Sequence, residues 1–339
     1  MRRSRFIATA AATAAGARAF PAFATGGLDT FSPPPAPQGG QTIRVLLGSG
    51  MATPIDGQSF SFGSRTFRGT FSTTAQGQVI NTLGLEEYLY SVVPQETPRS
   101  WPQETLRAQA VVARTYALSH VNPKREYDVV ASVRDQAYGG LQGEHAQSTD
   151  ACNATAGQIL AWQGSIASVS YMSCCGGHTE DPADAWTGGA DLPYLRGIVC
   201  NYCSASPDYR WVRDVPMTTV QNAFAAQSVS VGTLRTVDVA LADASGRAKS
   251  IRLSGESGSV EISGATFRRL LGPAVVRSLL IHSIAVAPGQ AQAGATMTLE
   301  GSGSGHGVGL CQWGSRGLAY EGRLARDILA FYFPGTHIQ

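Results

Sequence analysis

The stretch LEEYLYSVVPQETPRSWPQETLRAQAVVARTYAL, residues 85–118, decides how this chain folds. In its second half, small apolar residues recur at intervals of four, three and four, which gives one narrow apolar face on an α-helix. These residues are Leu106, Ala110, Ala113 and Ala117. We therefore predict a long buried helix that runs to about His120, preceded by a short helix over 86–93.

The segment Ser100-Trp101-Pro102-Gln103 is typical of a helix start. Ser100 is the expected N-cap, proline fits the first turn, and Gln103 would close a capping box. Ahead of both helices, short β-rich runs separated by Gly and Ser indicate antiparallel strands. They are TIRVLL (42–47), SFSF (59–62), TFRGTFST (66–73) and QVINTL (78–83).

The texture of the chain changes between residues 215 and 298, where alternating strands are joined by turns such as Asp-Ala-Ser-Gly. A helical segment, 265–272, interrupts these strands, and no residue cluster there is suited to chemistry. We predict an inserted β-rich domain over 215–298, with one catalytic domain built from 42–214 and 299–339. The expected fold class is α+β: a mainly antiparallel β scaffold with one long buried helix and an inserted β-rich lobe.

The first 24 residues have the pattern of a signal peptide. A charged start, MRRSRF, is followed by an Ala-rich stretch and by Ala-Phe-Ala at 22–24, which fits a cleavage site. The Arg2-Arg3 pair favours a twin-arginine signal, with an ordinary secretory signal as the alternative. The Pro- and Gly-rich residues 25–41 are expected to be a linker. We expect an exported protein, in a periplasm or at a cell wall, without a transmembrane segment in the mature chain.

The composition limits the classes of function. Of the 339 residues, 43% are hydrophobic, only 15% are charged and 39 are Gly, which excludes a coiled coil or an acidic disordered chain. The net charge is +2, but removing the four leader arginines leaves 22 basic against 24 acidic residues. Since no other basic cluster exists, no nucleic-acid partner is expected.

Glu96 is the first candidate for chemistry. It lies between a strand-like Val-Val-Pro and the predicted helix start, and Pro94 and Pro98 restrict the backbone around it. A carboxyl group held on such a turn and partly desolvated suits a general acid. From the residues alone, a capping or salt-bridging role for Glu96 is the competing interpretation.

Four motifs in order resemble the stage II sporulation protein D (SpoIID/LytB) family. They are the stretch at 85–118, DQAYGG (135–140), SCCGGHTED (173–181) with PYLRG (193–197), and GSGSGHGVGLCQWG (301–314) with YFPGT (332–336). The resemblance spans about 85–336 and matches 215–298 only in texture. It implies a lytic transglycosylase of peptidoglycan, with peptidoglycan glycan strands as the partner and Glu96, which follows VVPQ, as the catalytic acid.

The resemblance implies a mechanism with one catalytic carboxyl group. Glycoside hydrolases use two carboxylates about 5–9 Å apart, whereas a lytic enzyme needs one because the 6-hydroxyl of the sugar attacks C1. Glu96 would protonate the leaving oxygen and then accept the proton of that hydroxyl. Asp135, Glu180 and Asp181 are candidates for a second carboxylate, although a structural role in a turn or at the surface is favoured for each. No cofactor is expected for this reaction, because 129–134, where some family members carry a metal site, holds no Cys or His.

The same resemblance gives further candidates for substrate binding. Gln136 and Tyr138 match a Q-x-Y pair that could hydrogen-bond and stack on a sugar, and Arg114 could orient Glu96, bind a substrate carboxylate or form a structural ion pair. In the glycine-rich 301–314 segment, function and packing are both compatible with His306 and Gln312, while packing is favoured for Trp313.

Six cysteines complete the candidates: Cys152, Cys174, Cys175, Cys200, Cys203 and Cys311. Two short-spaced pairs offer three sulfurs and one nitrogen for a structural zinc ion. This predicted ligand set is Cys175, His178, Cys200 and Cys203. Because an exported protein oxidises its thiols, disulfides between the same loops are equally compatible with the pattern.

Two other functions remain open from the sequence. The LytB half of the family name suggests a non-catalytic peptidoglycan-binding protein that enhances a cell-wall amidase. A peptidase with Cys175 as nucleophile and His306 as base is a third hypothesis, which the neighbouring Cys174 and the Cys-x-x-Cys pair argue against.

Overall fold

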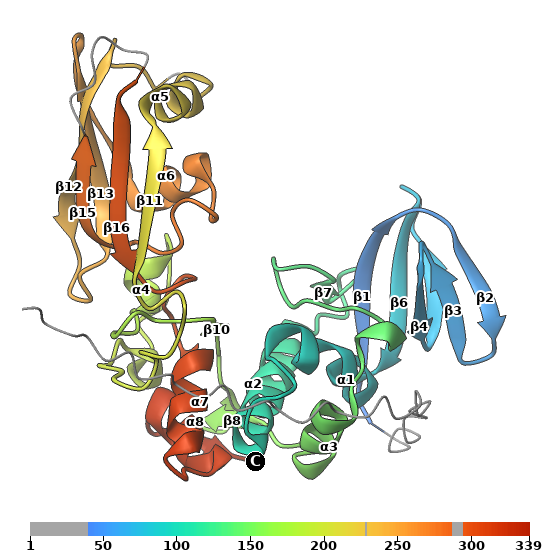
Figure 1. Cartoon of the computed structure of the whole chain (residues 1–339). Coiled ribbons are helices and arrows are strands. Elements are labelled where there is room, and N and C mark those ends of the chain that lie inside the picture. Colours follow the sequence, from blue (N-terminus) through green and yellow to red (C-terminus); the bar gives the residue numbers. More distant parts are fainter. Residues whose placement is uncertain (1–39, 228, 287–293) are drawn as a thin grey trace, which may run out of the picture. The chain divides into compact units, whose positions relative to one another are not determined.

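The computed structural model describes residues 40–227, 229–286 and 294–339. Helices and mainly antiparallel sheets make an α+β fold (Figure 1), as predicted. The predicted signal peptide and all but the last two residues of the predicted linker lie outside the described residues. Within the described part of the chain, no helix is long and apolar enough to cross a membrane.

Two small sheets begin the described chain. The first has the order β5-β6-β1-β7, in which β1 runs antiparallel to β6 and parallel to β7. Its strands are β1 (Thr42–Ser49), β5 (Thr70–Thr73), β6 (Gln78–Gly84) and β7 (Val129–Val130). The second is an antiparallel meander of β2 (Ala52–Asp56), β3 (Ser59–Phe62) and β4 (Arg65–Arg68).

Gly69 divides what the sequence predicts as one strand, 66–73. Its φ is +79°, a conformation that side chains disfavour, and a Cβ there would lie 2.2 Å from the carbonyl oxygen of Thr82. The chain therefore leaves the second sheet after β4 and enters the first sheet as β5.

Two helices follow, α1 (Leu85–Glu96) and α2 (Gln103–His120). The predicted capping box at Ser100 is wrong, because the N-cap of α2 is Pro102, without a side-chain cap. The chain first makes a tight turn in which the amide of Trp101 bonds to the carbonyl of Pro98. This turn places Ser100 too early to reach the amides of the first helical turn.

Helix α2 contributes to two separate cores. The predicted face of Leu106, Ala110, Ala113 and Ala117 packs with β1, β6 and α1. A second face, formed by Ala108, Val111 and Val112, packs against a core that includes Leu310 and Tyr332. The sequence predicts only the first face. The long helix is buried, as expected, but it is enclosed on both sides.

Short elements surround the second core. Strand β10 (Tyr171–Met172) pairs in parallel with β17 (Leu310–Cys311), and β18 (His337–Ile338) pairs antiparallel with β8 (Leu160–Trp162). The other elements here are β9 (Ser165–Ile166), α4 (Pro182–Ala185), α7 (Gln312–Tyr320) and α8 (Ala325–Tyr332), with a single 3₁₀ turn at Pro193–Leu195. A 3₁₀ turn at Leu141–Gly143 and helix α3 (Ala146–Ala154) belong instead with α1, and α3 packs into the core that contains β1 and β6.

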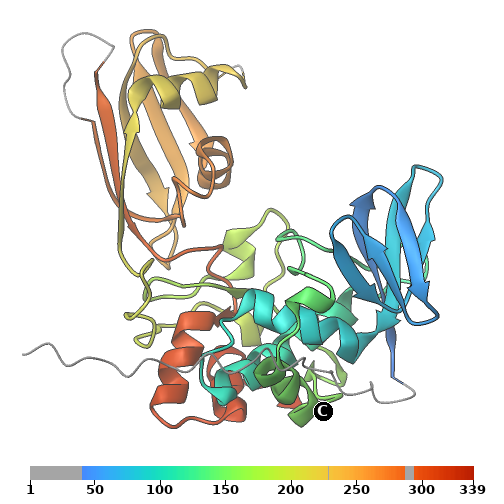
Figure 2. The same ribbon diagram turned by 45° about the vertical axis from the view of Figure 1, so that its right-hand side comes forward.

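A third core, made of residues between Trp211 and Leu299, lies in a β-rich lobe with two antiparallel sheets (Figure 2). One has the order β11-β16-β15 and the other β12-β13-β14. The strands are β11 (Trp211–Pro216), β12 (Leu234–Ala242), β13 (Ala248–Gly255), β14 (Gly258–Ser263), β15 (Leu280–Val286) and β16 (Thr296–Ser302), with helices α5 (Met217–Ala225) and α6 (Gly264–Leu271). Phe224 of α5 stacks on Phe267 of α6 inside this core.

Candidate functional site

Glu96 is the last residue of α1, and its carboxyl group is held from two sides. The Ala137 amide donates a 2.7 Å hydrogen bond to Glu96 Oε1. The Tyr171 hydroxyl, carried by β10, also lies against the carboxyl group. Burial raises the pKa of Glu96, and the hydrogen bonds from Ala137 and Tyr171 offset only part of that effect. The result is a partly buried carboxyl group that holds its proton at a higher pH than an ordinary glutamate.

Gln136 organises the groups around Glu96 from inside the core. Its amide nitrogen bonds to the Tyr171 hydroxyl and to the Ala113 carbonyl, both at 3.3 Å. Its amide oxygen accepts from the Tyr88 hydroxyl at 3.1 Å. The sequence predicts that Gln136 contacts a glycan directly. The side chain is fully buried, so such contact would need a rearrangement. Its placement fits a positioning role better.

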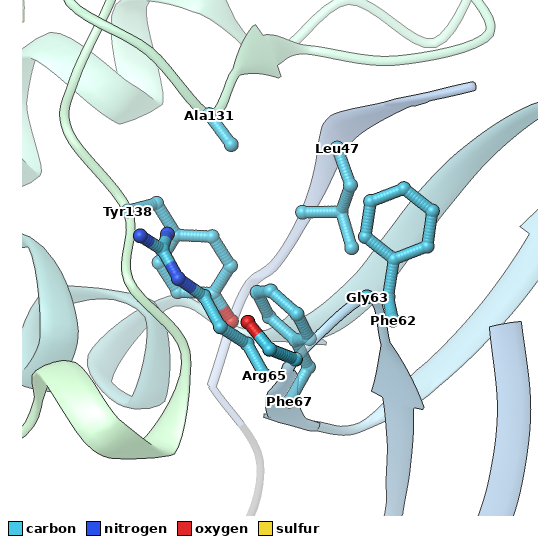
Figure 3. A pocket seen from close by; sticks show the side chains of 8 residues that line it. Leu47, Phe62, Gly63, Arg65, Phe67, Ala131 and Tyr138 are labelled. Carbon is cyan, nitrogen blue, oxygen red and sulfur yellow. The ribbon is translucent and has the colours of Figure 1, made fainter. Parts of the chain in front are cut away.

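Tyr138 is also buried in the core. Its hydroxyl donates to Asn81 at 2.8 Å, and its ring packs on Phe67 and Tyr88. The ring borders a cavity of about 250 Å³ (Figure 3). Leu47, Phe62, Gly63, Ser64, Arg65, Phe67 and Ala131 form the rest of its wall. The Tyr138 ring therefore has no fully exposed face for the sugar stacking that the sequence predicts.

Arg114 forms the structural ion pair that the sequence left open. Its guanidinium donates two 2.7 Å hydrogen bonds to the carboxylate of Glu86, and others reach the carbonyls of Cys152 and Gln158. The side chain is fully buried. The structure thus contradicts a substrate-binding role for Arg114, because every contact is internal and none involves Glu96.

Gln312 is likewise buried, where its amide meets that of Gln109 at 3.4 Å across α7 and α2. The next residue is more accessible. Trp313 packs edge-on against Trp101, and the Arg316 guanidinium lies over both rings. Tyr320, 64% exposed, extends this aromatic surface on α7.

His306 is a neutral, hydrogen-bonded residue. Its Nδ1 accepts from the Val308 amide, so Nε2 carries the proton and donates to the Tyr171 carbonyl at 3.0 Å. Burial lowers the pKa of His306 to about 4. One side of the ring faces Trp186, with 5.2 Å between the ring centres, at the wall of a cavity of about 760 Å³. Both hydrogen bonds of the ring are therefore to backbone groups, those of Tyr171 and Val308.

The alternative carboxylates all have structural partners. Asp135 accepts from the Tyr116 hydroxyl and the Val130 amide. Asp181 accepts from the Gly197 amide, and the buried Glu180 accepts from Ser245 beside Arg247. Glu180 is buried, whereas Asp135 and Asp181 are half-buried, as Glu96 is.

Four buried cysteines meet in the second core, and we call them the thiol cluster: Cys175, Cys200, Cys203 and Cys311. Their sulfur atoms all lie within 4.8 Å of one another. The predicted fourth ligand, His178, is wrong, because its Nδ1 is bonded to the Thr179 carbonyl and Cys311 takes its place. In the sequence, Cys311 lies 108 positions after Cys203, and no spacing rule joins the two residues.

The geometry does not fit the cysteine-peptidase hypothesis. Cys175 has no exposed surface, and its sulfur lies 3.6 Å from that of Cys203. His306 bonds to Tyr171 and Val308, and the hydrogen bonds of the described residues include none between His306 and Cys175. A nucleophile without access to substrate cannot act.

Sequence reasoning missed Tyr171, whose hydroxyl lies against the Glu96 carboxyl group. Tyr171 lies in the two-residue strand β10, and nothing in the spacing of the residues around it marks a site. The only signal is its place just before the SCCGGHTED motif. The end of α1, strand β10 and the loop that contains Ala137 meet at Glu96. They define a site with one carboxyl group, a tyrosine hydroxyl and a backbone amide in an α+β fold.

Comparisons with known proteins agree with this class. The family model described as Stage II sporulation protein (SpoIID) matches residues 73–162, and a Domain of unknown function (DUF8618) matches 184–309. Together with the relatives below, these matches show that the chain belongs to the SpoIID family.

Three relatives illustrate the range of the family. An uncharacterized protein of Brachyspira hyodysenteriae is 32% identical over 263 residues, which cover 77% of this chain and 68% of the relative. Stage II sporulation protein D of Bacillus subtilis is 26% identical over 77% of this chain and 76% of its own length. The amidase enhancer of Bacillus subtilis is 36% identical over 107 residues, only 14% of its length. These matches fit a function related to the cell wall.

Proposed function

We propose that this protein is an exported lytic transglycosylase that cleaves the MurNAc-GlcNAc β-1,4 bond of peptidoglycan. The observation that carries the proposal is the Glu96 carboxyl group, whose raised pKa and paired contacts suit a group that both donates and accepts a proton. The family assignment adds support, since it fits a function related to the cell wall.

In the proposed reaction, protonated Glu96 gives its proton to the glycosidic oxygen as the bond to C1 breaks. Positive charge develops on the MurNAc ring, and the 6-hydroxyl of the same sugar attacks C1. The Glu96 carboxylate takes the proton of that hydroxyl and returns to its starting state. The products are a free GlcNAc end and a 1,6-anhydro-MurNAc end, with no water consumed.

The neighbours of Glu96 suit both halves of this cycle. Partial burial favours the protonated acid that the first step needs. The Ala137 amide and the Tyr171 hydroxyl can then stabilise the carboxylate that forms after proton transfer. Asp135, Glu180 and Asp181 are tied to structural partners, which favours a mechanism with one acid over a two-carboxylate hydrolase.

The aromatic surface of Trp101, Trp313 and Arg316 is suited to sugar rings. Trp101 follows Glu96 by five residues, in the turn between α1 and α2. Half-buried indole rings with a fixed orientation offer apolar faces to a pyranose, and the guanidinium above them can bond to hydroxyl or carboxylate groups. We propose that this surface contacts the glycan strand.

The test is mass spectrometry of soluble products after the purified protein acts on peptidoglycan, both intact and stripped of stem peptides. Wild-type protein should release fragments ending in 1,6-anhydro-MurNAc. Glu96→Gln keeps the shape of the side chain but cannot transfer the proton, so the rate should fall by at least about 100-fold. Glu126→Gln, at an exposed position in the loop after α2, is the matched control and should match wild type.

The second candidate is a non-catalytic enhancer of a cell-wall amidase, which the match to the amidase enhancer favours. It predicts that wild-type and Glu96→Gln proteins bind the wall equally, release no glycan fragments and stimulate an added amidase to the same extent. That outcome would replace the enzyme proposal. Release of ordinary reducing ends, without the anhydro product, would instead indicate a hydrolase.

A further inference from the structure

The thiol cluster gathers three segments of the chain that are far apart in sequence. Cys175 follows β10, Cys200 and Cys203 lie in the loop before β11, and Cys311 ends β17 and caps α7. All four side chains are fully buried. A group that binds all four sulfurs would join the three segments at one point.

The distances between the sulfurs fit a tetrahedral metal ion. Zinc binds thiolate sulfur at about 2.3 Å, so two sulfurs of a tetrahedral site lie about 3.8 Å apart. The sulfurs of Cys175 and Cys203 are 3.6 Å apart, and no pair within the thiol cluster exceeds 4.8 Å. Two disulfides would join the sulfurs pairwise, and each would connect only two segments.

Hydrogen-bond donors face the cluster from several sides. The amides of Cys175 and Gly314 point at the Cys311 sulfur, at 3.2 and 3.3 Å. The Tyr332 hydroxyl lies 3.2 Å from the Cys200 sulfur, where it can donate. The buried guanidinium of Arg247 bonds to the Cys175 carbonyl at 2.8 Å. Such donors stabilise the negative charge of sulfurs bound to a metal ion.

We propose that the thiol cluster binds one zinc ion as a closed, structural centre. Four protein ligands fill the tetrahedral shell, so no position is left for water or substrate. The four thiols release their protons as the ion binds. Because Cys311 pairs with Met172 in the β10–β17 ladder, the ion would also fix the strand that carries Tyr171 toward Glu96.

The test is the zinc content of the purified full-length chain, measured by inductively coupled plasma mass spectrometry. Wild-type protein should carry about one zinc ion per chain, and Cys203→Ser and Cys311→Ser should lose most of it. Cys152→Ser is the matched control, because Cys152 is a buried cysteine of α3 outside the thiol cluster. Its zinc content should equal that of wild type.

A second measurement uses the wild-type protein alone. Cobalt(II) exchanged into the wild-type protein should give the strong visible absorption of a tetrahedral thiolate site, and added zinc should abolish it. Alkylation and mass spectrometry of the same sample count the disulfides. Protein without zinc, whose cluster cysteines are found in disulfides or fail to take up either ion, would overturn the proposal.

Discussion

At the scale of single residues, Glu96 combines two opposing influences. Burial makes its charged form costly, while the Ala137 amide and the Tyr171 hydroxyl stabilise that form. The net effect raises its pKa, so the balance favours the proton donor. Proline residues on either side, Pro94 and Pro98, keep the backbone in place while the proton moves.

The raised pKa of Glu96 predicts the pH dependence of the proposed activity. A general acid must be protonated, so kcat/KM should fall as pH rises through the Glu96 pKa. This basic limb should lie above the ordinary glutamate value of about 4.3. Initial rates of glycan release across a pH series measure it, and a limb at or below the ordinary value would contradict the role of burial.

Tyr171→Phe provides the control for this profile. The tyrosine hydroxyl lowers the pKa of Glu96 by stabilising its carboxylate, so its removal should move the basic limb to higher pH.

The raised pKa of Glu96 also predicts how the stability of the fold depends on pH. A group whose folded pKa is raised stabilises the fold at low pH, and this contribution is lost as pH rises through the folded pKa. Glu96→Gln should therefore flatten the pH dependence of the melting temperature.

At the scale of elements, α2 is the structural centre of the described chain. Its two faces belong to different cores, and α1 ends at Glu96 beside it. Arg114, inside α2, bonds to Glu86 at the start of α1 and to two carbonyls, one in the last turn of α3 and one in the loop after it. Helix α2 thereby fixes the orientation of α1 and the position of Glu96 at its end.

We predict that Arg114→Met destabilises the protein by about 3 kcal/mol, because it leaves the Glu86 carboxylate without its buried partner. Urea unfolding measures the loss. Arg107→Met is the matched control on the same helix, because its half-exposed pair with Glu104 should contribute less than about 1 kcal/mol. If Arg114 bound substrate instead, Arg114→Met would weaken glycan binding and leave stability unchanged.

At the scale of the whole molecule, Arg247 links the lobe to the second core. The residue lies in the turn between β12 and β13, and its buried guanidinium donates to the carbonyls of Cys175 and His178 at 2.8 and 2.9 Å. Glu180 faces it at 3.7 Å. A buried cation therefore connects the lobe to the loop that contributes Cys175.

Arg247→Met should cost about 3–5 kcal/mol, because it removes the buried cation that faces Glu180 and the donor to two backbone carbonyls. The change would be read from the urea midpoint. Arg252→Met, which removes an exposed pair with Glu261 in the same sheet, should stay within about 1 kcal/mol of wild type. Equal effects of the two variants would mean that the buried contact does not persist in solution.

Local rules were sufficient for much of this protein. The periodicity of 106–117 predicts a buried helix, the Gly- and Ser-separated runs predict antiparallel strands, and the motifs around Glu96 indicate the family, because each depends on neighbours within a few residues. Where a local rule failed, tertiary packing prevailed. Gly69 sends one predicted strand into two sheets, and the turn at Pro98 displaces the predicted N-cap.

The site needed long-range contacts that no spacing encodes. The sequence alone predicts the α+β class, the long helix and Glu96 as the candidate acid. The folded structure was needed to see that Tyr171 reaches Glu96, that Arg114 pairs with Glu86, and that the thiol cluster contains Cys311 in place of His178. Helix and strand patterns arise from the chain's own repeat, whereas a ligand set or a buried ion pair forms wherever packing brings distant segments together.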